Sequence, residues 1–276
     1  MLPTFVVIGA MKGGTTSLAE YLGAHPDVFM ATPKELDFFS NYWECGPAFY
    51  ERFFEGAGDS RARGEASPRY SRSPKYPDVP GRMAALIPDV RLVYLLREPV
   101  ERIRSVYAHW YYEGHEHRPL EVAVRERPEY IDSSRYAYQI DHYLECFDRE
   151  QLLVLDSDRL KTDRAATLRE ILEFIGVDPD AEIPNLADEF NVSAQRTQPI
   201  PAGRAFRNAL ERVHVRQFIP SRLRAAARHT VLERPIKAPT TEMSPAFEAE
   251  IWAELEPDLR RLRELVGPDF DLWGRA

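Results

Sequence analysis

The sequence predicts an α/β protein in which a mostly parallel central sheet carries helices on both faces. Three observations support this class. The chain has 276 residues, its short apolar runs alternate with helical patterns, and a glycine-rich turn joins the first run to the first helix. No segment has the composition of a linker, so we expect a single domain over residues 1–276.

The first apolar run and the helix after it set the pattern. Phe5–Gly9 is predicted to be a buried strand, and a helix is predicted over Gly14–Ala24, ending before Pro26. In this helix Leu18, Tyr21 and Leu22 share one face. A strand, a glycine-rich turn and a helix together aim backbone N–H groups and a helix N-terminus at an anion.

The later segments continue this alternation of strands and helices. The clearest buried strand is Arg91–Leu96, followed directly by a helix. In the first half of the chain we expect an extended piece at Met30–Phe39, an aromatic helix or loop packed on the core at 41–54, a strand and turn at Arg63–Tyr70, a short helix at Met83–Ile87, a helix at Pro99–Tyr112 and a mobile loop at Glu113–Pro128. In the second half we expect a helix at Ala137–Cys146, a strand at Leu152–Leu155, a helix at Ala165–Ile175, loops over Val177–Arg204, a basic helix at Ala205–Val215, and a helical region at Met243–Val266 broken at Pro257.

The first turn departs from the nucleoside-triphosphate loop in an informative way. A Walker loop reads G-x-x-x-x-G-K-[ST], and Gly9 and Gly14 have its spacing. Thr15 stands where the lysine is expected, and the lysine lies earlier, at Lys12. The loop therefore suits a phosphate-like group but lacks the lysine placement used on the β- and γ-phosphates.

A second anion-binding pair follows the strand at Arg91–Leu96. Arg97 comes directly after that strand, at the sheet edge where open α/β sheets bind ligands. Ser105 lies in the next helix, roughly opposite its apolar stripe. An arginine fork and a hydroxyl can together hold a phosphate. Two such sites on two strand ends suggest a nucleotide that is charged at two places.

Composition limits the classes of function and the compartment. A net charge of −8 argues against general nucleic-acid binding, and a hydrophobic content of 44% allows a sizeable core. Cys45 and Cys146 have neither metal-ligand nor disulfide-framework spacing. No leader pattern and no apolar run of about 18 residues is present, so we expect a cytoplasmic protein without a membrane span.

These motifs resemble a known enzyme family. GAMKGGTTSL and RLVYLLREPVERIRSVYAH, at 9–18 and 91–109, resemble the two cofactor signatures of sulfotransferases that use 3′-phosphoadenosine 5′-phosphosulfate (PAPS). The similarity is greatest to the branch that contains the heparan-sulfate sulfotransferases and bacterial relatives. KELDFF at Lys34–Phe39 resembles that branch's E-x-x-F-F segment, and later landmarks extend the likeness over nearly the whole chain.

The resemblance implies a role for each matching residue. Lys12 and Glu35 would be catalytic, with Lys12 at the leaving phosphate and Glu35 as the general base. Arg97 and Ser105 would bind the 3′-phosphate, and Arg196 is a candidate for the loop that closes over the nucleotide, with Arg204 as its alternative. The 5′-phosphosulfate would be bound by Lys12, Gly13, Gly14, Thr15, Thr16 and Ser17. The product would be adenosine 3′,5′-bisphosphate, and no metal is required. Ala66 departs from the family, in which some members place a catalytic lysine there.

Several alternatives stay open at the level of sequence. In an extended segment Glu35 and Asp37 would face the same side, and His109 and His142 are weaker candidates for the base. The acceptor would be a hydroxyl or amine of a carbohydrate, lipid or small natural product, and the sequence does not select among them. Arginines between 204 and 228 could form a groove for an anionic polysaccharide or simply a solvated helix face. A P-loop nucleotide kinase and a non-catalytic nucleotide-binding protein are the competing functions; the oligomeric state is undetermined.

Overall fold

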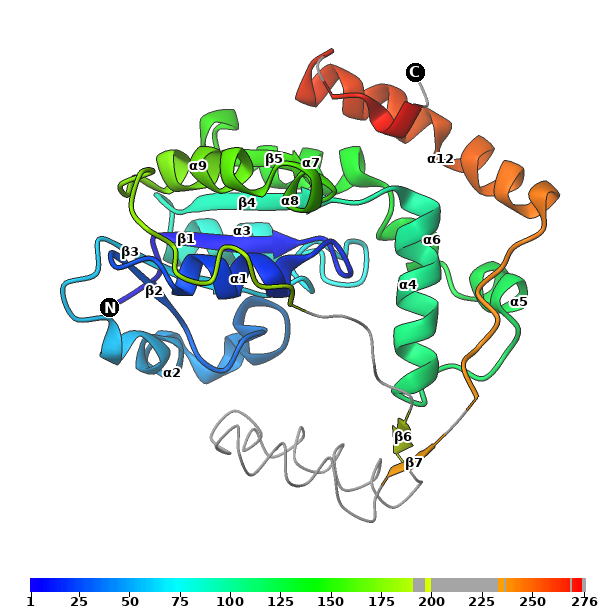
Figure 1. The fold of residues 1–276 in the computed structure, drawn as a ribbon, viewed down its shortest axis with the longest axis horizontal. Coiled ribbons are helices and arrows are strands. Elements are labelled where there is room, and N and C mark those ends of the chain that lie inside the picture. The colour runs from blue at the N-terminus through cyan, green and yellow to red at the C-terminus, as the bar shows by residue number, and fades with distance from the viewer. Residues whose placement is uncertain (191–196, 200–232, 236, 269, 275–276) are drawn as a thin grey trace.

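The computed structural model describes residues 1–190, 197–199, 233–235, 237–268 and 270–274. Its centre is a five-stranded parallel sheet with strand order β2-β3-β1-β4-β5 (Figure 1). The strands are β1 Phe5–Gly9, β2 Val28–Met30, β3 Ala62–Ala66, β4 Arg91–Leu96 and β5 Leu152–Asp156. All four neighbouring pairs are parallel, so the five carboxyl ends lie at one edge. The α/β class with a mostly parallel sheet is confirmed; that residues 1–276 form one domain stays a prediction.

Alternate side chains of the central strands belong to two separate hydrophobic clusters, one on each face of the sheet. In β1, Val6 and Ile8 belong to one buried cluster, whereas Phe5 and Val7 belong to the other. One cluster includes side chains of α3, α4, α7 and α12, and the other includes side chains of α1 and α9. Helices therefore cover both faces of the sheet, as the nearly continuous apolar composition of β1 and β4 predicts.

Helices α1, α4, α7, α9 and α12 begin and end within two residues of their predicted bounds, whereas α3 begins four residues earlier than predicted and α5, α6 and α8 were not predicted. The α-helices are α1 Thr15–Gly23, α2 Pro47–Glu51, α3 Val79–Leu86, α4 Pro99–Tyr112, α5 Leu120–Glu126, α6 Glu129–Asp132, α7 Tyr136–Leu144, α8 Arg159–Thr162, α9 Arg164–Ile175 and α12 Pro245–Val266. Shorter 3₁₀ and π turns occupy 38–45 and 52–57, and β6 Thr197–Pro199 pairs with β7 Glu233–Pro235 antiparallel. Helix α4 lies across the carboxyl edge of the sheet in Figure 1. The basic helix expected at Ala205–Val215 falls outside the described residues.

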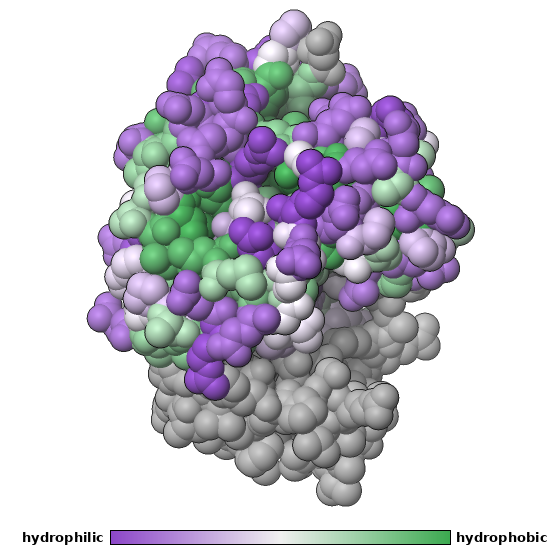
Figure 2. Space-filling view, turned by 90° about the vertical axis from the view of Figure 1, so that its left-hand side faces the viewer, coloured by the Kyte–Doolittle hydropathy of each residue, from purple (hydrophilic) through white to green (hydrophobic). Residues whose placement is uncertain are grey.

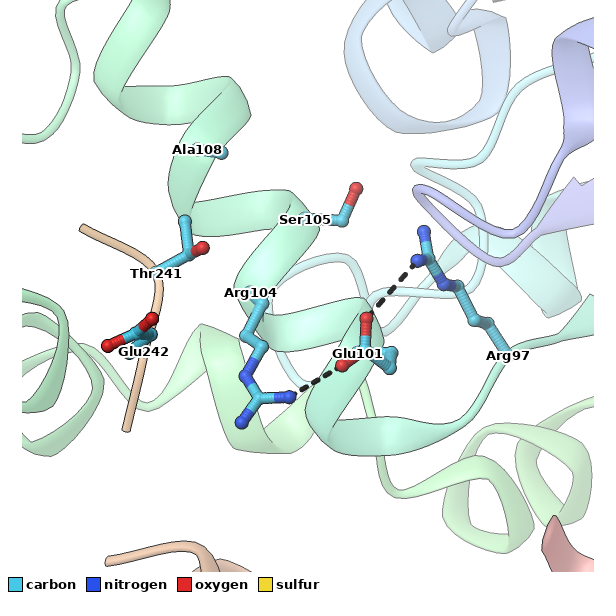
Figure 3. A pocket seen from close by; sticks show the side chains of 7 residues that line it. All are labelled: Arg97, Glu101, Arg104, Ser105, Ala108, Thr241 and Glu242. Carbon is cyan, nitrogen blue, oxygen red and sulfur yellow. Dashed lines mark hydrogen bonds and ion pairs between the residues drawn. The ribbon is translucent and has the colours of Figure 1, made fainter. Parts of the chain in front are cut away.

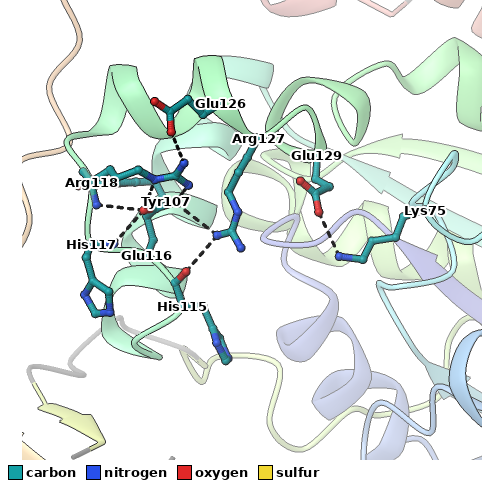
Figure 4. Close-up of polar contacts among 9 residues, drawn as sticks. All are labelled: Lys75, Tyr107, His115, Glu116, His117, Arg118, Glu126, Arg127 and Glu129. Atoms are coloured by element: carbon teal, nitrogen blue, oxygen red, sulfur yellow. Dashed lines mark hydrogen bonds and ion pairs between the residues drawn. The ribbon is translucent and has the colours of Figure 1, made fainter. Parts of the chain in front are cut away.

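The expected mobile loop over 113–128 is wrong. Helix α5 lies within it, and the Glu116 carboxylate is 2% exposed. Figure 4 shows this carboxylate between Arg118 at 2.6 Å and Arg127 at 3.3 Å, and Arg118 also bonds Glu126. The polar composition predicts that this segment is exposed to solvent. Instead, the ion pairs compensate the buried charge of Glu116 and hold the segment in one conformation.

The break expected at Pro257 is also wrong, because α12 continues through it. Leu255 and Leu259, on either side of the proline, are buried, and the carboxylate of Asp258 accepts hydrogen bonds from the N–H groups of Ala137 and Tyr138. These bonds cap the first turn of α7. An interior proline costs about 3 kcal/mol, and the burial of Leu255 and Leu259, together with the bonds from α7 to Asp258, offsets that cost.

One face of the molecule lies at the amino ends of the strands. Figure 2 shows hydrophilic side chains over most of the described part of this face, around one hydrophobic area.

In the described part of the chain, no helix combines the length and apolar character that a membrane span needs.

Candidate active site

The turn after β1, here called the glycine loop (residues 9–17), packs directly on the backbone of β4. The Ala10 N–H donates to the Leu95 carbonyl at 2.7 Å, and the Gly13 N–H donates to the Ala10 carbonyl at 2.8 Å. A Cβ added at Gly13 would lie 2.8 Å from the Leu95 oxygen. Only glycine fits this approach, and Gly14 has a φ of 83°, a left-handed conformation that glycine adopts without strain.

The glycine loop presents a helix N-terminus to the site. Helix α1 begins at Thr15, and its Leu18 N–H bonds the Gly14 carbonyl, so the earlier N–H groups of the first turn have no partner within the helix. Gly14 is the N-cap residue and offers no side chain to satisfy them. This arrangement suits a phosphate or sulfate group. The Ser17 hydroxyl instead donates to the Phe190 carbonyl at 3.2 Å, which tethers the segment after α9.

Three cations and a carboxylate converge beside the glycine loop. Burial lowers the pKa of the Lys12 ammonium below its ordinary value, and Arg97 and Lys34 lower it further, whereas Glu35 acts in the opposite direction. The Lys34 Nζ lies 3.4 Å from the Thr15 hydroxyl and 3.1 Å from the Glu35 carboxylate. Clustered cations are self-repelling, so a bound dianion would relieve their repulsion.

Arg97 and Ser105 line one cavity of about 430 Å³. Figure 3 shows the Ser105 hydroxyl and the Arg97 guanidinium turned toward the same space. The Arg97 Nη1 donates to the Lys12 carbonyl at 3.2 Å, so the cavity adjoins the glycine loop. The predicted pair thus comes together. The other lining residues are Glu101, Arg104, Ala108, Thr241 and Glu242.

Two further contacts hold Arg97 in place. The Tyr136 hydroxyl donates to the Arg97 carbonyl at 2.6 Å and so fixes its backbone. The Glu101 carboxylate lies 3.7 Å from the Arg97 guanidinium and 2.6 Å from that of Arg104. Sequence reasoning missed Tyr136, Glu101 and Thr241. Tyr136 and Thr241 lie far along the chain from Arg97, and no spacing rule connects them.

Glu35 lies in a second segment, here called the carboxylate loop (residues 34–39). The extended conformation expected there is wrong, because Glu35 and Asp37 have φ values of 63° and 53°. Their side chains therefore do not share a side. The Glu35 side chain is 52% exposed beside Lys34, whereas Asp37 is buried and pairs with Arg69 at 3.0 Å.

The two carboxyl groups differ in acidity for physical reasons. Burial raises the pKa of Asp37 to about 6, against the opposing charge of Arg69. Burial also acts to raise the pKa of Glu35, but Lys34 and Arg69 outweigh it and leave that pKa below the ordinary value. At neutral pH the Glu35 carboxylate is ionised and accessible, as a base must be.

The two histidines considered as alternative bases occupy different places. His109, on α4, is within electrostatic range of both Lys12 and Glu35; burial, followed by Lys12, lowers its pKa. His142 lies on α7, 3.9 Å from Glu145. Arg196 and Arg204 fall outside the described residues. Within the described residues no group of three or more His, Cys, Asp or Glu side chains could hold a metal ion.

The fold and this geometry define a class of α/β protein that gathers cationic and hydroxyl side chains at the carboxyl edge of a parallel sheet, where open α/β sheets bind ligands. The family comparison is more specific. The model of the sulfotransferase domain family matches residues 2–223, so the chain belongs to the sulfotransferase family.

Individual relatives agree with this family. Human heparan sulfate glucosamine 3-O-sulfotransferase 3B1 is 30% identical over 185 residues, which cover 64% of this chain and 46% of that protein. The mouse bifunctional heparan sulfate N-deacetylase/N-sulfotransferase 4 is 31% identical over 202 residues, covering 64% and 23%. The chain thus spans less than half the length of these curated relatives.

A solved structure extends the likeness to the whole fold. The crystal structure of a sulfotransferase from Alicyclobacillus acidocaldarius has a TM-score of 0.70 and 26% identity, and the match covers all of both chains. The sulfotransferase domain from the curacin biosynthetic pathway, at 15% identity, shares the fold with a TM-score of 0.53, over 93% of this chain and 98% of that chain.

Proposed function

We propose that this protein transfers a sulfuryl group from PAPS to a hydroxyl or amine of an acceptor. Glu35 is the general base in this proposal, and Lys12 stabilises the leaving phosphate. The observation that carries the proposal is the meeting of Lys12, Lys34 and Glu35 beside an uncapped helix N-terminus. Such a site combines anion binding with an ionised, accessible carboxylate.

The residues fit the two charged ends of the co-substrate. The glycine loop leaves no room for a Cβ at Gly13, which lets backbone N–H groups approach a 5′-phosphosulfate closely. The cavity of Arg97 and Ser105 offers a guanidinium and a hydroxyl to a 3′-phosphate. Bound PAPS would supply the activated sulfuryl group, and these residues would orient it.

The protein's own part in the reaction is positioning and charge stabilisation. Glu35 takes the proton from the attacking acceptor group. Lys12 and the N–H groups at the start of α1 face the negative charge that develops on the leaving phosphate. Lys34 bonds both Thr15 and Glu35, and so links the glycine loop to the carboxylate loop.

The nucleotide kinase considered above fits this arrangement less well. Thr15 occupies the position of the Walker lysine and is buried, with its hydroxyl facing Lys34. A lysine serving β- and γ-phosphates is therefore missing from that position. The acceptor class stays broad in this proposal: a carbohydrate, a lipid or a small natural product. The heparan sulfate sulfotransferases among the relatives favour a saccharide.

The direct test combines turnover with nucleotide binding. We expect radiolabelled sulfate to pass from PAPS to a member of a saccharide, lipid and phenol panel, with no loss of rate in EDTA. Calorimetry should give tighter binding of adenosine 3′,5′-bisphosphate than of ATP with Mg²⁺. Preferential binding of ATP, or phosphoryl transfer from it, would contradict the proposal.

A further inference from the structure

A fully buried carboxylate lies behind the carboxylate loop. Glu65, in β3, is 1% exposed, and no cation bonds it among the described residues. Three hydroxyls donate to it instead: Tyr50 at 2.5 Å and Tyr70 at 2.9 Å to Oε1, and Ser67 at 2.6 Å to Oε2. Burying an unpaired charge is costly, so this arrangement calls for an explanation beyond packing.

The carboxylate fixes the direction of the hydroxyl hydrogen bonds around it. An ionised carboxylate only accepts hydrogen bonds, so each hydroxyl must turn its proton toward Glu65. The lone pairs of Ser67 and Tyr70 are then free to accept from elsewhere. Both hydroxyls do accept from backbone N–H groups of the carboxylate loop.

These bonds hold alternate residues of the carboxylate loop. The Asp37 N–H donates to the Ser67 hydroxyl at 3.1 Å, and the Phe39 N–H donates to the Tyr70 hydroxyl at 3.5 Å. The Glu35 N–H donates to the carbonyl of Ala66, the residue next to Glu65, at 3.2 Å. The backbone that carries the base is thereby attached to residues 66–70, here called the β3 turn, at both left-handed residues and at Phe39.

We propose that Glu65 is a positioning residue for the base: it orients the hydroxyls of Ser67 and Tyr70, which hold the carboxylate loop in its left-handed conformation. The catalytic part of this inference rests on the proposed role of Glu35. The Tyr50 hydroxyl donates to the same carboxylate, and the Tyr50 ring packs against Phe38 and Phe39 of the carboxylate loop. The change Tyr50→Phe keeps this ring contact and removes only the hydroxyl that donates to Glu65.

The surroundings of Glu65 explain why the arrangement depends on its charge. Burial raises the pKa of the Glu65 carboxyl to about 7, against the hydroxyl bonds. The ionisable groups facing it are Tyr50 from α2, Tyr70 from the β3 turn, Asp37 from the carboxylate loop and Tyr143 from α7. A protonated Glu65 must donate its proton, and one of its three hydroxyl donors must then turn away.

The test compares two variants that each delete one hydroxyl donor to Glu65. Ser67→Ala removes a hydroxyl that also holds the loop, whereas Tyr50→Phe removes one that does not. At a pH above the Glu65 pKa of about 7, where the wild-type carboxylate is ionised, we expect the Asp37 amide to exchange with solvent about tenfold faster in Ser67→Ala and in Glu65→Gln, and at the wild-type rate in Tyr50→Phe. The kcat should fall about tenfold in the first two variants and less than twofold in the third, with affinity for adenosine 3′,5′-bisphosphate unchanged in all.

The two readouts separate the inference from the function on which it rests. Unchanged Asp37 exchange in Ser67→Ala, or equal effects of Ser67→Ala and Tyr50→Phe, would overturn the positioning role. Wild-type protein with the expected exchange pattern but without sulfuryl transfer would contradict the proposed function and leave the hydrogen-bond arrangement supported. Thermal unfolding and nucleotide affinity of each variant confirm that it is folded.

Discussion

The glycine loop and the carboxylate loop meet at one site but are built in opposite ways. The glycine loop is held largely by backbone contacts, with Ala10 and Gly13 packed against Leu95, and the Arg97 guanidinium adds a bond to the Lys12 carbonyl. The carboxylate loop is held largely by side chains, through Ser67 and Tyr70 and the buried Glu65 behind them. The first construction leaves a sequence signature of glycines, and the second does not.

The two loops also treat charge differently. Around the glycine loop, burial and then the like charges of Arg97 and Lys34 lower the pKa of Lys12, and this cluster of cations suits an anion. In and behind the carboxylate loop, the pKa of each carboxyl group depends on its burial. Glu35 is accessible and its pKa is lowered, whereas burial raises the pKa of Asp37, beside Arg69, and that of Glu65, among hydroxyls. Cofactor binding and proton transfer should therefore respond to different substitutions.

The largest expected effect is on Glu35. Glu35→Gln keeps shape and hydrogen bonding but cannot take the proton, so kcat should fall on the order of 10²–10⁴-fold. Affinity for adenosine 3′,5′-bisphosphate should stay within about twofold, because this change leaves the glycine loop intact. Steady-state kinetics and calorimetry measure the two values. A variant that keeps more than about a tenth of wild-type kcat, with chemistry rate-limiting, points to His109 or Asp37 as the base.

A change at Lys12 should lower both kcat and nucleotide affinity, whereas the change at Glu35 should lower kcat alone. Lys12→Ala removes charge from both the bound nucleotide and the leaving phosphate, so kcat and affinity should both fall, kcat by about a hundredfold. The same two assays apply, with Lys34→Ala as the matched loss of one nearby ammonium. If Lys12→Ala changes only one of the two parameters, its dual role is wrong.

Titration of Glu65 should make the free energy of unfolding depend on pH. The folded-state pKa of about 7 lies above the ordinary 4.5, so the protonated form is favoured on folding. Its contribution to stability is fully present below pH 4.5 and is lost as the pH rises through about 7. Relative to wild type, Glu65→Gln should gain about 1–3 kcal/mol in free energy of unfolding between pH 4.5 and pH 8. Denaturant melts at several pH values measure this difference, and a pH-independent difference would contradict it.

The smallest expected effect concerns the 3′-phosphate. Hydrogen bonds to charged groups are worth roughly 1.5–3 kcal/mol, so wild-type protein should bind adenosine 3′,5′-bisphosphate at least about tenfold more tightly than adenosine 5′-phosphate. Arg97→Ala should erase most of this preference, and Arg104→Ala, in the same cavity, should erase less. Calorimetry with both ligands decides the matter; equal affinities in the wild type would refute the Arg97 role.

The sequence determined much of the fold through local patterns. Periodicity identified the strands β1, β4 and β5 and helix α4, because continuous apolar runs and a 3.6-residue repeat are local properties. The glycine loop was equally accessible, since a strand, two glycines and a helix start follow one another in the chain. The meeting of Arg97 with Ser105 also followed from one strand–helix unit.

Only the tertiary structure decided which carboxylates are exposed, which are buried and how their pKa values shift. Glu35, Asp37 and Glu65 are all acidic residues in the sequence, and nothing local distinguishes one that is solvated from one that is buried. Their conformations and pKa values depend on Arg69, Ser67 and Tyr50, brought together by the pairing of β3 with β1 and by the packing of α2. Likewise, ion pairs with arginines offset the cost of burying the Glu116 carboxylate, and tertiary packing offsets the cost of Pro257 inside α12. Burial and hydrogen-bond direction are properties of the assembled fold, so a linear pattern cannot contain them.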